Sequence, residues 1–287
     1  MKKVLVTGSN GQLGRCIKDA LSSFPELDIY FTTKTILNIE DEESVEQFFR
    51  ENKFDYCINT AAFTNVEKAE NEIKKVFKTN SEAVKNLVLR CKEKNTVLIQ
   101  ISTDYVFDGK KRTPYKEEDL ANPLNVYGAS KLKGERYIEE IYEKYFIFRT
   151  SWLYSQYGNN FLISILKNLK DGNRLTITTE QTGTPTNAND LAKVILEIIA
   201  SGSVEYGLYH YSNAGEITWY DFAKAILQDS KQFDQTKLAK TDHYRTFAAR
   251  PKYSVLNTNK YSKTFNRECI EWKLSLTSLL RKINYNQ

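Results

Sequence analysis

The first half of the chain alternates short apolar runs with longer stretches whose apolar residues recur at helical spacing. Short apolar strands between helices are typical of a parallel sheet that is covered on both faces. The pattern therefore predicts an α/β fold with a doubly wound parallel sheet. The predicted strands are 4–6, 28–31, 55–59, 97–101 and 145–149, and the predicted helices are 12–21, 42–49, 67–94 and 127–142.

The second half of the chain is less regular. Helices are predicted at 161–169, 189–201, 219–227 and 276–283, a β-like run at 175–179, and a sixth core strand at 207–211. We expect the chain to leave the sheet after residue 150, to return for 187–213, and to leave again. This predicts a large domain over 1–150 and 187–213, and a smaller, discontinuous domain over 151–186 and 214–287.

Composition and charge indicate what kind of protein this is and which partners are not expected. The 287 residues are 41% hydrophobic and 27% charged with a net charge of +5, which is typical of a soluble globular protein. The basic residues are scattered among acidic ones, so no nucleic-acid partner is predicted. No apolar run is long enough for a membrane span or a signal peptide. The four cysteines are widely spaced, as are His210 and His243, so we predict free thiols, a cytoplasmic location and no metal.

Three glycines follow the first strand and open the first helix. Gly8, Gly11 and Gly14 stand at three-residue spacing directly after Thr7. Glycine allows a sharp turn and a close approach of pyrophosphate, and a helix N-terminus offers unpaired N–H groups to it. A tight turn without a ligand is the alternative interpretation. The strand and helix on either side favour a dinucleotide site, and hence a Rossmann-like sheet.

The segment after the second strand bears on the choice of cofactor. NAD-binding proteins often carry an acidic residue there for the ribose diol. Here 30–34 read Tyr-Phe-Thr-Thr-Lys, without a carboxylate. Lys34 could face a 2′-phosphate, which predicts that NADPH is accepted at least as well as NADH. Lys34 could equally be a solvated loop lysine.

Tyr127 and Lys131 form a candidate proton donor. Residues four apart lie on one face of a helix, and a nearby ammonium is expected to lower the pKa of a tyrosine. A surface Tyr and Lys with no such role are the alternative. At the end of the fourth strand, Ser102 and Thr103 both offer a hydroxyl to hold a substrate carbonyl. Because strand residues alternate in direction, only one of the two should reach the site.

Together these segments resemble the extended short-chain dehydrogenase/reductases, and among them the dTDP-4-dehydrorhamnose reductases. The similarity runs from end to end, and its segments in the second half of the chain are the more diagnostic ones. The matching segments are 7–14, 58–70, 102–109, 123–131, 149–154, 181–186 and 250–256, together with Asn80.

The resemblance implies reduction of the C4 ketone of dTDP-4-dehydro-β-L-rhamnose to dTDP-L-rhamnose by NADPH or NADH. Thr103, Tyr127 and Lys131 match the catalytic residues of the family. The implied cofactor-binding residues are Gly8, Asn10, Gly11, Gln12, Leu13, Gly14, Lys34, Ala61, Ala62, Thr64, Asn80, Tyr127 and Lys131. The implied substrate-binding residues are Asp104, Tyr105, Trp152, Gln181, Arg250 and Ser254.

The chain departs from the family pattern at several positions. Asn38 stands where an aspartate is usual, and Tyr253 and Asn257 differ from the usual asparagine and aspartate. Some relatives dimerise around magnesium held by a glutamate near the glycine loop. Arg15 and Cys16 occupy that stretch here, which predicts no such metal and a monomer or weak homodimer.

Two other functions stay open on the sequence. The chain could act as a reductase or epimerase on another 4-keto nucleotide sugar. It could also be a non-catalytic, dinucleotide-binding regulatory subunit, similar to the regulatory β subunit of methionine adenosyltransferase.

Overall fold

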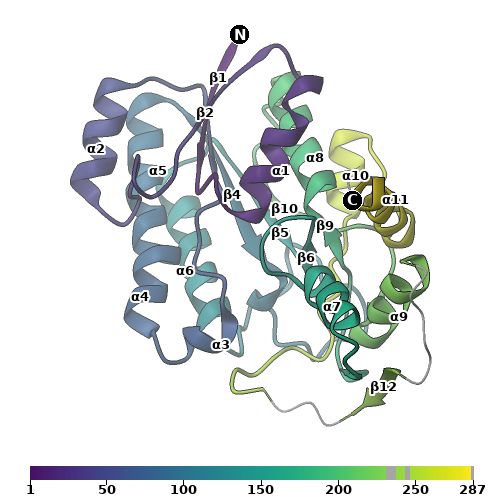
Figure 1. Ribbon diagram of the computed structural model, residues 1–287. Coiled ribbons are helices and arrows are strands. Elements are labelled where there is room, and N and C mark those ends of the chain that lie inside the picture. The colour runs from purple at the N-terminus through teal and green to yellow at the C-terminus, as the bar shows by residue number, and fades with distance from the viewer. Residues whose placement is uncertain (231–236, 243–245, 286–287) are drawn as a thin grey trace.

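The computed structural model describes residues 1–230, 237–242 and 246–285. Its centre is a six-stranded sheet in the order β2-β1-β3-β4-β5-β10, in which every neighbouring pair is parallel (Figure 1). The chain order reverses at β1, so the doubly wound parallel sheet predicted from the sequence is confirmed. The strands are β1 (Lys2–Thr7), β2 (Leu27–Phe31), β3 (Tyr56–Asn59), β4 (Val97–Thr103), β5 (Tyr145–Thr150) and β10 (Gly207–His210).

Helices cover both faces of this sheet, as Figure 1 shows. Val4 and Val6 of β1 are buried in an apolar cluster with residues of α1 and α8, whereas Leu5 belongs to a second cluster with α2, α5 and α6. Side chains on both faces of the sheet therefore pack against apolar residues of the helices, which is why the strands are continuously apolar. These helices are α1 (Gln12–Ala20), α2 (Glu42–Glu51), α5 (Ala83–Lys94), α6 (Val126–Ile141) and α8 (Ala188–Ser201).

The region predicted as one helix over 67–94 is instead divided. It forms α3 (Val66–Ala69), α4 (Ile73–Phe77), a π-helical turn η2 (Lys78–Glu82) and then α5. The π-turn carries the buried Asn80. Its side chain accepts a hydrogen bond from Phe63 N at 2.9 Å and donates one to Phe63 O at 3.0 Å. The turn thus fixes the loop that follows β3, and π-turns are frequent at functional sites.

The second half of the chain contributes a separate apolar cluster. Tyr154, Leu162, Phe222 and Leu276 are among its buried members. We propose, in line with the prediction, that 151–186 and 214–287 form a smaller domain, and this cluster supports the division. Its larger elements are α7 (Phe161–Lys170), β7 (Leu175–Thr178), α9 (Trp219–Asp229), β12 (Leu238–Thr241) and α11 (Trp272–Tyr285).

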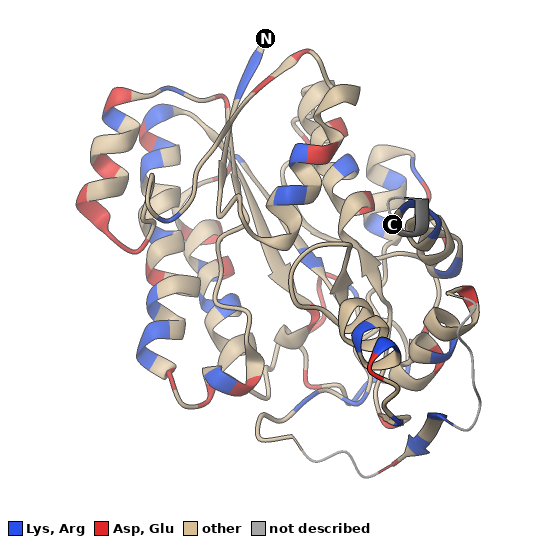
Figure 2. Ribbon diagram, in the orientation of Figure 1, with Lys and Arg blue, Asp and Glu red and all other residues tan. Residues whose placement is uncertain are grey.

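Two pairs of short strands lie within the second half of the chain. β6 pairs with β9 in parallel, and β8 pairs with β11 in antiparallel orientation. Both signs of charge are distributed over the outer helices, while the inner strands are mostly uncharged (Figure 2). No helix in the described residues is long and apolar enough to cross a bilayer. The short elements are η1 (Leu21–Ser23), η3 (Asp104–Val106), β6 (Leu153–Tyr154), β8 (Thr182–Gly183), β9 (Thr186–Asn187), β11 (Ile217–Thr218) and α10 (Asn259–Phe265).

The contact between α6 and the π-turn gives a stability prediction. A Cβ added at Gly134 would overlap the carbonyl oxygen of Asn80. Gly134→Ala should therefore lower the free energy of unfolding by about 1–3 kcal/mol through overpacking. This would occur although alanine is favoured over glycine within a helix by about 1 kcal/mol.

Urea denaturation measures this, with Glu140→Ala at an exposed position of α6 as the control. A Gly134→Ala protein more stable than the parent would show that the contact is loose.

Candidate active site

A cavity of about 530 Å³ lies at the carboxyl edge of the sheet. That volume is within the range of small-molecule sites. The segments that follow β1, β3, β4 and β5 all contribute to its walls, as expected where the strand order of a doubly wound sheet reverses. Trp219 and Arg250 add walls from the second half of the chain.

The glycine loop forms one end of the cavity. Gly8 has φ +65°, and a Cβ there would lie 2.7 Å from the backbone of Ala61. Gly11 is the N-cap of α1, makes no side-chain cap, and is followed by no acidic residue in the first turn. Gly11, Gln12 and Leu13 line the cavity. The exposed N–H groups of this helix end therefore suit the pyrophosphate of a dinucleotide.

Gln12 also ties this loop to the second half of the chain. Its Nε2 donates to the carbonyl of Leu153 at 3.1 Å, and its Oε1 accepts from Asn160 Nδ2 at 2.7 Å. Asn160 in turn caps α7 by accepting from Ile163 N. The glycine loop and the wall opposite it are thus held at a fixed separation.

A chain of buried polar side chains connects the strand ends beneath the cavity. Thr7 Oγ1 donates to Asn59 Oδ1 at 2.6 Å, and Asn59 Nδ2 donates to Gln100 Oε1 at 2.8 Å. Thr60 Oγ1 donates to the carbonyl of Thr7 at 2.6 Å. The sequence analysis missed Asn59, Thr60 and Gln100. Polar residues inside or at the end of otherwise apolar strands were the available signal.

Thr103, Tyr127 and Lys131 meet in this cavity. Thr103 ends β4; its Oγ1 donates to Asp104 Oδ1 at 3.2 Å, accepts from Tyr105 N at 3.2 Å, and lies near the Tyr127 side chain. Lys131 is buried, and its Nζ donates to the carbonyl of Ile101 at 2.5 Å. The three side chains therefore converge from the end of β4 and the first turns of α6.

Local contacts at the start of α6 place Tyr127. Asn125 caps the helix by accepting from Gly128 N at 2.8 Å. A Cβ at Gly128 would overlap the carbonyl oxygen of Tyr105, so only glycine allows the helix to approach η3 this closely. The rings of Tyr105 and Tyr127 meet edge to face, with centroids 6.0 Å apart.

Of the two hydroxyls at the end of β4, Thr103 is the one that meets Tyr127. The Ser102 hydroxyl instead donates to the carboxylate of Glu135. Both residues nevertheless line the cavity, so the expectation that only one of them reaches the site is wrong, although their hydroxyls have different partners.

Burial shifts the pKa of each ionisable group in this cluster. It raises the pKa of Tyr127, an effect that the hydrogen bond with Thr103 opposes and the neighbouring Asp104 reinforces. It lowers the pKa of Lys131 to about 8, against the opposing charge of Glu135. The expected lowering of the Tyr127 pKa by Lys131 is wrong for this structure, because loss of solvation sets the direction of the shift and Lys131 is not among its causes. Tyr127 therefore holds its proton at neutral pH.

Aromatic side chains form the wall opposite the glycine loop. Trp152 has φ 45°, a conformation that non-glycine residues rarely adopt and that is often found at functional sites. Its ring stacks on Trp219 with centroids 3.5 Å apart, and Trp219 Nε1 donates to Gln181 Oε1 at 3.0 Å. Phe161 packs against Trp219 at 4.6 Å. Nothing in the local sequence pointed to Trp219 or Phe161.

Arg250 is held at the cavity by an acidic residue of α3. Its Nη2 lies 2.7 Å from Glu67 Oε1, and Glu67 Oε2 accepts from the backbone N–H groups of Phe247 and Ala248. The carbonyl of Ala249 accepts from Asn125 at 2.8 Å. The segment that carries Arg250 is thereby anchored to both α3 and α6.

A second cavity of about 420 Å³ adjoins the first. The two share Asn159, Asn160, Trp219 and Arg250 as lining residues, and Gln181 belongs to the second one. The site therefore has a main compartment beside Tyr127 and an annex beyond Trp219.

The sequence as a whole matches the family model described as the RmlD substrate binding domain over residues 1–285. The chain belongs to this family. A dTDP-4-dehydrorhamnose reductase of Aggregatibacter actinomycetemcomitans is 34% identical over 97% of this chain and 98% of its own.

Two solved structures of the family are similar throughout. A dTDP-4-dehydrorhamnose reductase from Bacillus anthracis, solved in complex with NADP, superposes with a TM-score of 0.93 at 34% identity, covering 98% of this chain and 99% of its own. A dTDP-4-dehydrorhamnose reductase from Clostridium acetobutylicum gives a TM-score of 0.93 at 37% identity, with the same two coverages. The resemblance stated from the sequence is thus confirmed.

The family resemblance implied site residues that fall into two groups. Those that line the first cavity are Gly11, Gln12, Leu13, Ala62, Thr64, Thr103, Asp104, Tyr105, Tyr127, Lys131, Trp152 and Arg250. Those outside its lining are Gly8, Asn10, Gly14, Lys34, Ala61, Asn80, Gln181 and Ser254.

Several residues of the second group have other contacts. Asn80 braces the Phe63 backbone, Gly14 packs on Ser9, and Ser254 is buried. The roles of all these residues in binding stay predictions.

The sequence also predicted that the protein binds no metal, and this prediction concerns the His, Cys, Asp and Glu side chains. Within the described ranges, no group of three or more His, Cys, Asp or Glu side chains could hold a metal ion. His210 is buried in β10, and His243 lies outside the described residues. The four cysteines are free thiols.

The buried Asp104 predicts an unusual dependence of stability on pH. Burial raises its pKa to about 7, against hydrogen bonds from Ser254 and Thr103. The folded protein then holds a proton that the unfolded chain has released, so Asp104 lowers the free energy of unfolding as the pH rises from about 4 to about 7. The stability of Asp104→Asn relative to the parent should be greater at pH 8 than at pH 5 by more than about 1 kcal/mol.

Urea denaturation at both pH values measures this difference. Asp28→Asn, at an exposed position of β2, is the control and should give similar differences at both. An unchanged difference for Asp104→Asn would mean that this carboxyl is well solvated.

Proposed function

We propose that the chain reduces the C4 ketone of dTDP-4-dehydro-β-L-rhamnose to dTDP-L-rhamnose with NADPH or NADH. The observation that carries this proposal is the cavity itself, which brings a proton-bearing Tyr127, Thr103 and a buried Lys131 together across from an uncapped helix N-terminus. The names of the full-length relatives, and the NADP bound to one of them, support it.

The chain's own residues fit a dinucleotide. The free N–H groups at the start of α1 would hold the pyrophosphate. Lys131 uses one of its three N–H donors on the carbonyl of Ile101 and has others for ribose hydroxyls. When bound, the reduced nicotinamide supplies the hydride.

Tyr127 and Thr103 act on the carbonyl oxygen of the substrate. Thr103 orients the C4 carbonyl oxygen by a hydrogen bond. Tyr127, whose raised pKa keeps the phenol protonated until negative charge develops on that oxygen, donates the proton. The ammonium of Lys131 then stabilises the phenolate that remains.

The second half of the chain holds the rest of the substrate. Tyr105 and Trp152 offer apolar surface with polar edges to the sugar. The guanidinium of Arg250, which borders both cavities, suits the pyrophosphate. The annex with Gln181 is the place for the nucleoside.

We also propose that the protein acts in the cytoplasm as a monomer or weak homodimer. Its four free thiols suit a reducing compartment.

A Tyr127→Phe variant tests the proposed reaction. With enzymatically prepared keto sugar, the parent should oxidise NADPH, and NMR should show the rhamno configuration at C4 of the product. Tyr127→Phe should fold and bind cofactor, while kcat falls by roughly 100- to 10,000-fold because the positioned acid is lost.

The control is Tyr137→Phe, which also lies on α6 but has its hydroxyl near Glu82 rather than in the cavity. Unchanged turnover in Tyr127→Phe would remove the phenol from the mechanism. Failure of the parent, together with a stoichiometric protein partner, would favour a regulatory subunit.

Lys34 gives a separate prediction about the cofactor. It lies 2.8 Å from Glu40 and its side chain is 67% exposed, so it is free to turn toward a 2′-phosphate. NADPH should be used at least as efficiently as NADH. Lys34→Ala should weaken binding of NADPH by roughly tenfold, or about 1.4 kcal/mol, and leave NADH unchanged.

Calorimetric titration with each cofactor measures this, with the exposed Lys53→Ala as the control. A strong preference of the parent for NADH would refute the assignment of Lys34.

A further inference from the structure

A buried ion pair lies directly behind the candidate catalytic residues. Arg149 Nη2 is 2.7 Å from Glu135 Oε2, and Arg149 Nε is 3.1 and 3.2 Å from the two carboxylate oxygens. The two side chains are 6% and 2% exposed, the lowest values for any ion pair in the described part of the chain. Burying such a pair seldom stabilises a protein more than a well-packed apolar pair would. Its presence here therefore calls for a role other than stability.

Glu135 and Lys131 attach two successive turns of α6 to the end of one strand. Lys131 Nζ donates to the carbonyl of Ile101, and the hydroxyl of Ser102 donates to Glu135. The next residue of β4 is Thr103. The carboxylate of Glu135 thus sets the position of α6 relative to β4. This strand carries both the Ile101 carbonyl, which binds Lys131, and the hydroxyl of Thr103.

Glu135 also lies within reach of two cations. Lys131 is four residues earlier on the same face of the helix, and Arg149 comes from β5. Arg149 engages the carboxylate with its planar fork, which leaves the Lys131 ammonium on the Ile101 carbonyl and not on Glu135. Lys131 therefore points toward the cavity because Arg149, and not Lys131, pairs with Glu135.

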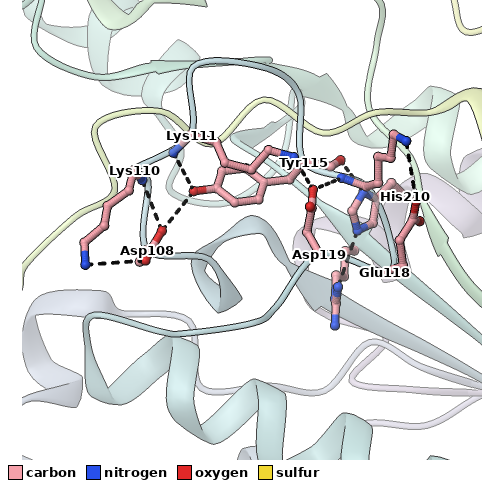
Figure 3. A network of polar contacts seen from close by, with 9 residues as sticks. Asp108, Lys110, Lys111, Tyr115, Glu118, Asp119 and His210 are labelled. Atoms are coloured by element: carbon pink, nitrogen blue, oxygen red, sulfur yellow. Dashed lines mark hydrogen bonds and ion pairs between the residues drawn. The ribbon is translucent and has the colours of Figure 1, made fainter.

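The other side of Arg149 is held by uncharged groups. Its guanidinium lies over the ring of Phe107 at 5.1 Å, and its Nη1 is 3.5 Å from His210 Nε2. Burial lowers the pKa of His210 to about 3, and Nδ1 of this neutral ring lies 3.0 Å from the carbonyl of Tyr115 (Figure 3).

The network continues outward, where the Tyr115 hydroxyl donates to Asp108 at 3.0 Å. Phe107 and His210 therefore hold one side of the Arg149 guanidinium, and its other side pairs with the carboxylate of Glu135.

We propose that Glu135 is a positioning residue for the reaction proposed above, acting through Ser102 and Arg149 to hold Lys131 and Thr103 in their working positions. Glu135 is not among the residues that line the cavity. The inference rests on the proposed function, because it assigns a role in that reaction.

The charge of Glu135 has a second consequence. The ionisable groups that line the cavity together with Lys131 are Tyr127, Asp104, Tyr105 and Arg250, and Glu135 is its neighbour on α6. Among them, Glu135 opposes the lowering of the Lys131 pKa by burial. Without that carboxylate the ammonium would be lost at lower pH, so the alkaline limb of the kcat profile should move to lower pH.

The test uses the full chain with the keto sugar and NADPH. Glu135→Gln keeps the shape and removes the charge. The double variant Glu135→Leu/Arg149→Met fills the same space without polar groups, so it should keep a melting temperature near that of the parent. For each folded variant we expect KM for the keto sugar within about threefold of the parent, kcat lower by at least tenfold, and an alkaline limb at lower pH.

Glu140→Gln, an exposed carboxylate on the same helix, should leave all three readouts unchanged. The proposal is overturned if either variant is folded and has the kcat and pH profile of the parent. If neither variant folds, Ser102→Ala, which removes the contact of Glu135 with the strand, must lower kcat at a parental melting temperature and leave KM for the keto sugar within about threefold, since Ser102 also lines the cavity. A parent that does not reduce the keto sugar would instead refute the proposed function.

Discussion

The close approach of α6 to the end of β4 is the constraint on which the site depends. Gly128 meets the carbonyl of Tyr105, and the buried Lys131 reaches the carbonyl of Ile101. At this separation Tyr127 meets Thr103. A helix one side chain further away would leave the three groups on separate surfaces.

The same contact excludes water, and this gives the site its electrostatic character. Burial raises the pKa of Tyr127 and lowers that of Lys131, so the phenol keeps its proton and the ammonium is poorly solvated. Each shift is a cost in free energy that the surrounding structure must offset. The hydrogen-bonded chain from Thr7 through Asn59 to Gln100 pairs these three buried side chains beneath the cavity. A rigid, satisfied base of this kind preorganises the groups above it.

Much of the fold could be predicted because its causes are local. The strands are apolar on both faces, and this pattern alone indicates a covered parallel sheet. Tyr127 and Lys131 were identifiable because their spacing puts them on one side of a helix. The division of 67–94 was not, because the apolar spacing along this segment does not reveal that Asn80 in the π-turn pairs with the backbone of Phe63. Trp219, Glu67 and Glu135 were missed for the same reason, since their partners lie far away in the sequence. The direction of the Tyr127 pKa was wrong because spacing does not reveal burial.

The most direct test of this account is a crystal structure of the protein with NADP⁺ and dTDP-L-rhamnose. The account predicts that the C4 oxygen of the sugar lies within hydrogen-bond distance of both Tyr127 Oη and Thr103 Oγ1, with Lys131 Nζ on the nicotinamide ribose. A C4 oxygen out of reach of both hydroxyls, or a nicotinamide away from Lys131, would contradict it.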